Sequence, residues 1–200
     1  MTANLEDLEN LKIIRETMER SSTVTSVSGL GVMGMGVIAL IGAYVAPLQT
    51  SDESRIYIWL AIAVIGCMTG IASTWHQSRT RGPVTRLSAG RRFGLALAPP
   101  IIAGLVLTDF FMRQSQFDLM PGTWMLLYGA GVITAGAFSV RLIPLMGIVF
   151  MILGAIGLYL PDSWFQPVWQ HMAPIDFYLG LVFGGIHLLF GAIITVKCNS

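Results

Sequence analysis

Long apolar runs alternate with short polar segments along most of this chain. The runs predict six membrane-spanning helices, at residues 24–46, 56–75, 93–111, 122–140, 142–160 and 175–196. A hydrocarbon core about 30 Å thick needs about 20 apolar residues in a helix, which is close to the length of each run. A soluble helical bundle is excluded, because the runs lack the polar face that such a helix turns to water. We therefore predict an all-α, polytopic membrane protein built as a six-transmembrane-helix bundle.

A different periodicity precedes the first span. Apolar residues recur every three or four positions on one helical face, at Leu5, Leu8, Leu11, Ile14 and Met18. They predict a cytoplasmic amphipathic helix over residues 4–20. Its acidic residues outnumber its basic ones, unlike the helices that bind anionic lipid, so we expect its apolar face to dock on the bundle or on a partner protein. The expected domains are this helix at 1–23, the transmembrane domain at 24–196 and a short cytoplasmic tail at 197–200.

The basic residues give the predicted helices an orientation. Ten of the twelve Lys and Arg residues fall on one side, in the N-terminus, the loop 76–92, the turn at Arg141 and the tail; Arg55 and Arg113 fall on the other. Short loops rich in Lys and Arg stay in the cytoplasm. We predict that both termini are cytoplasmic, which requires an even number of spans. Because the first 23 residues are polar, we also expect the first span to be an uncleaved anchor.

Composition narrows the classes of function. The chain is 54% hydrophobic and 12% charged, against about 25% charged in a typical soluble domain. Its two cysteines lie far apart, which argues against a disulfide framework. The chain contains no Walker loop, zinc-spaced Cys/His set, Ser-His-Asp arrangement or metalloprotease motif. We therefore predict no enzyme activity, no catalytic residue and no metal site, and nothing in the fold class supports nucleic-acid binding.

His187 is the only ionisable side chain near the middle of any predicted span, where such a group is costly. Three interpretations stay open. The residue is a neutral histidine hydrogen-bonded inside the bundle, part of a proton or substrate path, or an axial ligand of haem, the one cofactor that we consider. Neither His76 nor His171 lies at a depth suited to a second haem ligand.

Pro99-Pro100 lies inside the third predicted span. Each proline removes a backbone donor and clashes with the preceding turn, so we expect a kink or a broken helix there. Broken helices line the substrate sites of transporters, whereas a bend filled by neighbouring side chains is the structural alternative.

Glycines gather in the first, second, fourth and sixth predicted spans. Small residues let helices approach closely in lipid, where burial of apolar surface gives no driving force. These faces predict close packing within the bundle or against a second copy or a partner subunit.

Two loops are candidate contact surfaces. The loop 76–92 contains Arg79, Arg81, Arg86, Arg91 and Arg92 and no acidic residue. It either determines topology only or also contacts anionic lipid or an acidic partner. The segment 161–174 contains Trp164 and Trp169 between prolines. It is interpreted as a membrane-surface anchor or a partner contact.

Several segments resemble an uncharacterised family of small bacterial multi-pass membrane proteins. They are LKIIRETMERSSTVTSVSGLGVMGMGVIALIGA, FGLALAPPIIAGLVLT, PGTWMLLYGAGVITAGAFSVRLIPLMGIVFMILGA and FGGIHLLFGAII. The resemblance implies a bacterial inner (cytoplasmic) membrane and carries no activity and no site residue.

The leading hypothesis is a non-enzymatic accessory, structural or regulatory subunit of a membrane protein complex. Its contacts would be membrane lipid and either a protein partner or a second copy of the chain. One alternative is a small transporter or channel-like protein that uses Pro99-Pro100 and His187. The other is a haem- or pigment-associated membrane subunit.

Overall fold

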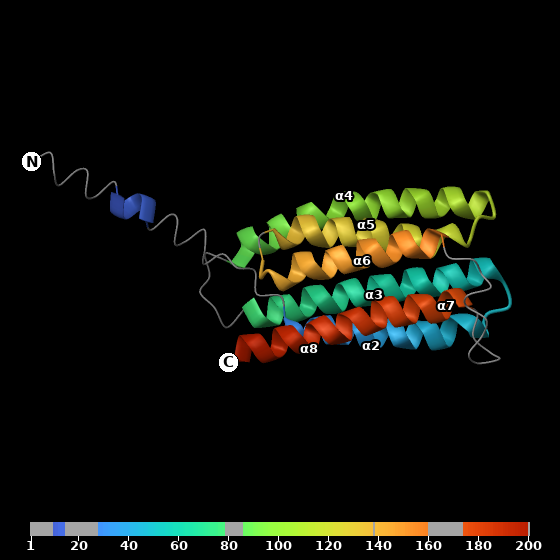
Figure 1. Ribbon diagram of the computed structural model, residues 1–200, viewed down its shortest axis with the longest axis horizontal. Coiled ribbons are helices and arrows are strands. Elements are labelled where there is room, and N and C mark those ends of the chain that lie inside the picture. Colours follow the sequence, from blue (N-terminus) through green and yellow to red (C-terminus); the bar gives the residue numbers. More distant parts are fainter. Residues whose placement is uncertain (1–9, 15–27, 79–85, 138, 160–173, 200) are drawn as a thin grey trace, which may run out of the picture.

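The computed structural model describes residues 10–14, 28–78, 86–137, 139–159 and 174–199. Long helices lie side by side in one elongated bundle, and residues 10–14 form a separate helical turn (Figure 1). The elements are α2 (Gly29–Val45), η1 (Ala46–Leu48), α3 (Asp52–Ser78), α4 (Arg86–Arg113), α5 (Leu119–Gly136), α6 (Leu142–Tyr159), α7 (Pro174–Leu179), η3 (Gly180–Gly184) and α8 (Gly185–Asn199). The last three follow one another without a break and together form the last predicted span.

Each of the six predicted spans corresponds to a helix, which confirms the all-α fold class. Five of the described helices are long and apolar enough to cross a membrane, at Gly29–Leu48, Asp52–His76, Phe93–Arg113, Leu142–Tyr159 and Ile175–Lys197. Helix α5 does not reach that hydropathy, because glycines, threonines and a proline occupy many of its positions. The structure therefore supports a polytopic membrane protein with five candidate spans. Of the predicted N-terminal helix, only residues 10–14 lie within the described chain.

Side chains and prolines set where several helices begin. The Ser28 hydroxyl accepts a hydrogen bond from the Gly31 amide at 3.3 Å and caps α2. The Ser51 hydroxyl accepts one from the Ser54 amide at 3.2 Å at the start of α3. Such caps satisfy amide groups that have no partner in the first helical turn. Pro174 opens α7, a position where the missing amide hydrogen costs nothing.

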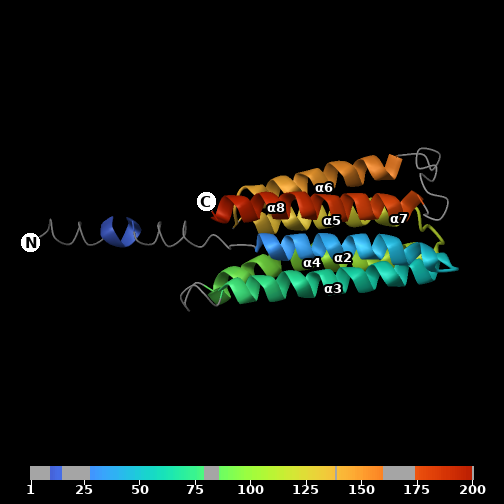
Figure 2. The ribbon, with the colours of Figure 1, turned by 90° about the horizontal axis from the view of Figure 1, so that it is seen from below.

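The bundle divides into two groups of helices, which we call the two units. Helices α3, α7, η3 and α8 pack against α2 in one group, and α4 and α6 pack against α5 in the other. The two views show the units lying against each other along their length (Figures 1 and 2). The backbones of the two units come closest where α6 meets α8. We call the surface between the units the unit interface.

Glycines at seven-residue spacing bring α2 close to η3 and α8. A Cβ added to Gly29 would lie 2.7 Å from the Gly191 carbonyl oxygen, and one added to Gly191 would lie 2.8 Å from the Gly29 oxygen. A Cβ added to Gly36 would lie 2.8 Å from the Gly184 carbonyl oxygen. These helices can pack this closely only because the four positions carry no side chain.

The other unit has a matching pair in α5 and α6. A Cβ on Gly129 would lie 2.6 Å from the Gly147 carbonyl oxygen, and one on Gly122 would lie 2.9 Å from the Gly154 oxygen. The spacing is again seven residues on each helix. The predicted glycine faces of the first, fourth and sixth spans thus serve packing within the bundle, while Gly66 of the second span faces open space.

Helix α4 continues through Pro99 and Pro100, so the expected broken helix is not found. Pro100 has no amide hydrogen, and the Ala96 carbonyl one turn earlier therefore lacks its usual helical donor. The Thr134 hydroxyl of α5 lies 3.3 Å from the Ala96 oxygen and also reaches carbonyls of its own helix. A neighbouring helix thus supplies a donor where the proline removes one, which lets α4 persist in an apolar setting.

Candidate functional site

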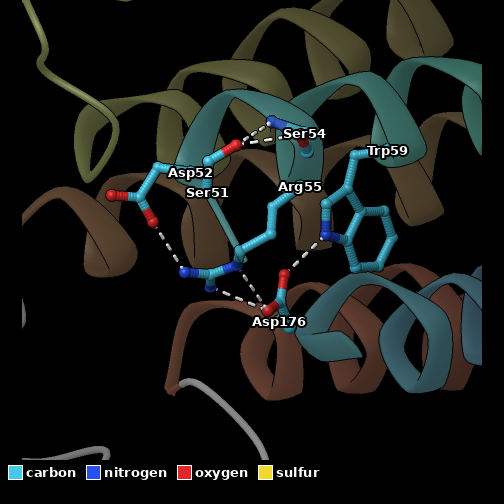
Figure 3. Close-up of polar contacts among 6 residues, drawn as sticks. All are labelled: Ser51, Asp52, Ser54, Arg55, Trp59 and Asp176. Atoms are coloured by element: carbon cyan, nitrogen blue, oxygen red, sulfur yellow. Dashed lines mark hydrogen bonds and ion pairs between the residues drawn. The ribbon is translucent and has the colours of Figure 1, made fainter. Parts of the chain in front are cut away.

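A buried carboxylate joins α3 to α7 at one end of the bundle. Asp176 is fully buried, with 0% of the residue exposed. One of its oxygens accepts hydrogen bonds from Arg55 Nε at 3.1 Å and from a terminal guanidinium nitrogen at 2.7 Å. The other accepts from Trp59 Nε1 at 2.7 Å (Figure 3). We call Arg55, Trp59 and Asp176 the Asp176 cluster.

Every donor nitrogen of the Asp176 cluster has a defined target. Arg55 also reaches Asp52, three residues before it, at 2.9 Å (Figure 3). A buried carboxylate is tolerated only when it is paired and hydrogen-bonded, and both oxygens of Asp176 meet that condition. Asp176 is buried although it lies in the first turn of its predicted span, whereas His187 is the ionisable side chain near the middle of that span.

Aromatic side chains near this end divide into two kinds. Tyr44, Tyr57 and Tyr159 are exposed, as residues of a membrane-interface belt would be. Trp59 and Trp124 instead donate inside the protein, Trp124 to the Thr108 hydroxyl at 2.8 Å. Their indole N–H groups link α3 to α7 and α5 to α4.

His187 of α8 is buried at the unit interface, 3% exposed. Its Nδ1 lies 2.7 Å from the Phe183 carbonyl oxygen, and its Nε2 lies 2.8 Å from the Tyr128 hydroxyl of α5. A carbonyl can only accept, so Nδ1 carries the hydrogen and Nε2 accepts from Tyr128. This arrangement agrees with the interpretation of His187 as a neutral histidine hydrogen-bonded inside the bundle.

Aromatic rings surround His187. Phe150 of α6 lies with its ring centre 5.2 Å from that of the imidazole, and Tyr128 packs edge-on against Phe150 at 4.9 Å. The ring of Phe183 stacks on the imidazole at 6.2 Å. A metal bound at Nε2 would have to displace the Tyr128 hydroxyl. Within the described chain, no three His, Cys, Asp or Glu side chains gather in a way that could hold a metal ion.

The turn before His187 is π-helical. Residues Gly180–Gly184 form η3, between α7 and α8, and the Phe183 carbonyl that accepts from His187 belongs to it. A π-helical turn inserts an extra residue and is frequent at functional sites. Tyr178, just before this turn, donates from its hydroxyl to the Leu153 carbonyl of α6, a second link across the unit interface.

The structure describes only some of the other predicted site residues. Leu11 and Ile14 lie in the helical turn 10–14 and are 62% and 53% exposed. The backbone of Arg86, Arg91 and Arg92 forms the first turns of α4. Outside the described residues or side chains lie Leu5, Leu8, Met18, Arg79, Arg81, Trp164, Trp169 and the side chains of the three α4 arginines.

Sequence reasoning missed the Asp176 cluster and Tyr128. Asp176 falls in the first turn of the last predicted span, and Arg55 immediately precedes the second span on the same side. Opposite charges at the same membrane depth were therefore visible in the sequence. What the sequence lacks is a sign that these two helices, 121 residues apart at this contact, are neighbours.

No protein-family model, curated protein or solved structure matches this chain.

Proposed function

We propose that this chain is a non-enzymatic six-helix membrane protein that serves as an accessory, structural or regulatory subunit of a membrane complex. One observation carries the proposal. The buried polar side chains of the described bundle, Thr108, Asp176 and His187, each take part in a hydrogen bond between two helices. Polar groups used in this way hold helices in register and are not left available for a substrate.

The N-terminal segment supports a partner contact. Leu11 and Ile14 keep more than half of their surface exposed and do not dock on the described bundle. Apolar residues on one face of a helix outside the membrane need a cover, and a groove on a partner protein is a common one. The partner face that we propose contains Leu5, Leu8, Leu11, Ile14 and Met18, as the periodicity indicates.

The test is purification from the native membrane in mild detergent, with the mass of the particle and its composition measured. We expect a stoichiometric complex. Replacing Leu11 and Ile14 with Asp should release the partner, while Tyr159→Ser, at an exposed position of the bundle, should not. A monodisperse monomer in both the wild type and the control would contradict the proposal.

We also propose that α5 crosses the membrane, which gives six spans with both termini in the cytoplasm of a bacterial inner membrane. Helix α5 packs along α4 and α6 and has 18 residues, as many as α6. Supporting the orientation, Arg141 and Lys197 share one end of the bundle, while the basic-poor end holds the Asp176 cluster. The assignment to a bacterial inner membrane rests on the family resemblance.

Cysteine labelling tests this topology. In a background without Cys67 and Cys198, Ser115→Cys and Arg141→Cys would place single thiols at the two ends of α5. A membrane-impermeant maleimide should label position 115 from outside the cell and position 141 only after the membrane is opened. Labelling of both from the same side would exclude α5 as a span.

A second candidate function is transport of a solute through the membrane along the unit interface. The observation that favours it is the π-helical turn at Gly180–Gly184, which directly precedes His187 where the two units meet. In many transporters, one group of helices rocks against another around a site near the middle of the membrane. Solute flux in liposomes that falls in His187→Ala supports this candidate; absent or unchanged flux removes it.

A further inference from the structure

A cavity opens where the two units meet at the Arg141 end of the bundle. It is open to its surroundings, and its volume is about 340 Å³. Its walls come from the start of α6 and the end of α8: Val140, Arg141, Leu142, Leu145, Ile194 and Lys197. The site is far from the Asp176 cluster and does not include His187.

Two cations line this cavity, and both are exposed. Arg141 directly precedes α6, and Lys197 lies in the last turn of α8. The carboxylate partners found in the described chain belong to Arg55 and Arg113 instead. Two like charges at one cavity repel each other unless an anion lies between them, and phosphate is a strong acceptor for both side chains.

The rest of the wall is apolar. Ile194 is buried, whereas Leu145 is 49% exposed. Since α6 and the segment Ile175–Lys197 are both candidate membrane spans, the exposed Leu145 would face lipid in a membrane. A ligand held here would therefore meet charge at one end and lipid-facing apolar surface at the other.

We propose that this cavity binds an anionic phospholipid. Its phosphate would lie between Arg141 and Lys197, and an acyl chain would run past Leu145 along the groove between α6 and α8. Basic pockets between transmembrane helices are established binding places for acidic lipid headgroups. The apolar wall distinguishes a lipid from a free phosphate ion, which would make no use of Leu145. Such a lipid would join the two units where their backbones come closest.

The experiment uses the full-length protein in detergent with phosphatidylglycerol or phosphatidylcholine added, and native mass spectrometry measures the bound lipid. We expect phosphatidylglycerol to be retained in preference to phosphatidylcholine. The double variant Arg141→Gln, Lys197→Gln should weaken that binding about 25-fold, at about fivefold for each charge removed. The matched control Lys12→Gln, Arg113→Gln removes two charges outside the cavity and should bind as the wild type does.

A third variant separates a lipid from a free phosphate. Leu145→Trp fills the apolar wall and keeps both cations, so it should weaken phosphatidylglycerol binding and leave any binding of inorganic phosphate unchanged. If the double variant does not fold, Lys197→Gln alone, at an exposed position, provides the charge test with a loss of about fivefold. Equal binding of the two lipids, or full displacement of phosphatidylglycerol by inorganic phosphate with no effect of Leu145→Trp, would overturn the proposal.

Discussion

Tyr128 and His187 form a hydrogen bond of 2.8 Å across the interface between the two units of the bundle. The tyrosine comes from α5 and the histidine from α8, helices that belong to different units. Both ring nitrogens of the histidine are engaged, because Nδ1 donates to the Phe183 carbonyl. The pair therefore fixes both the tautomer of the imidazole and the position of one unit against the other.

Tyr128→Phe should lower the free energy of unfolding by about 1 kcal/mol, the usual scale of a hydrogen bond between membrane helices. The phenyl ring keeps the aromatic packing and leaves His187 Nε2 without its donor. Thermal unfolding in detergent measures the loss. Tyr159→Phe removes a hydroxyl from a side chain that is 88% exposed and serves as the control. Equal stabilities of the two variants would mean that the Tyr128 bond contributes nothing.

Substitutions at Arg55 and Asp176 should lower the free energy of unfolding by different amounts. Arg55→Met leaves a fully buried carboxylate with only the Trp59 donor, and we expect a loss of about 3 kcal/mol. Asp176→Asn removes the negative charge but keeps an acceptor, and Arg55 retains Asp52, so the loss should be smaller. The double variant Arg55→Met, Asp176→Leu should recover much of the stability. Chemical unfolding measures the free energy of unfolding of the three variants. A double variant less stable than Arg55→Met alone would show that the unpaired carboxylate is not the cause of the loss.

The effect of a glycine-to-alanine substitution on stability should depend on what the added methyl group meets. Gly129→Ala places a methyl group against the Gly147 backbone oxygen, which cannot move aside as a side chain can. We expect a loss of about 1–3 kcal/mol, as for overpacked cores. Gly66→Ala meets nothing within 4 Å and should be neutral or slightly stabilising through helix propensity. Melting curves of the two proteins decide the matter, and a destabilised Gly66→Ala would point to a contact outside the single chain.

The Thr134 hydroxyl and Pro100 should be thermodynamically coupled. Thr134→Val removes the donor near the Ala96 carbonyl and should cost about 0.5–1.5 kcal/mol. Pro100→Ala restores a backbone amide hydrogen at that position, and this amide can bond the Ala96 carbonyl itself. In that background the loss of the Thr134 hydroxyl should cost less. A double-mutant cycle measures the difference, and additive effects would show that Thr134 does not compensate for the proline.

The helices could be predicted because the membrane imposes a simple rule. A segment in hydrocarbon must satisfy its own backbone hydrogen bonds, so apolar runs of sufficient length become helices regardless of their neighbours. This is why α3 and α6 coincide closely with their predicted spans. The same rule explains why α4 stays helical through Pro99-Pro100. The donor for the Ala96 carbonyl comes from Thr134, 38 residues further along the chain. No local sequence pattern predicts this hydrogen bond.

The candidate sites were harder to predict because they depend on which helices are neighbours. His187 stands out in the sequence as a lone polar residue in a span, but its partner Tyr128 has no feature that separates it from an interfacial tyrosine. Asp176 is visible as an acidic residue near an outer loop, but the sequence gives no sign that it pairs with Arg55 of α3. Glycine spacing was the most useful signal of contact, since it marked α2, α5 and α8 as closely packed helices.

The pairing of α2 with α8 determines when these helices can pack during synthesis of the chain. Helices α4, α5 and α6 are consecutive, so their unit can be complete soon after α6 leaves the ribosome. Helix α2 precedes α8 by the whole of the α4–α6 unit, so Gly29 and Gly36 are covered only after α8 has been made. During synthesis, the small-residue face of α2 is therefore open to other membrane helices until α8 arrives.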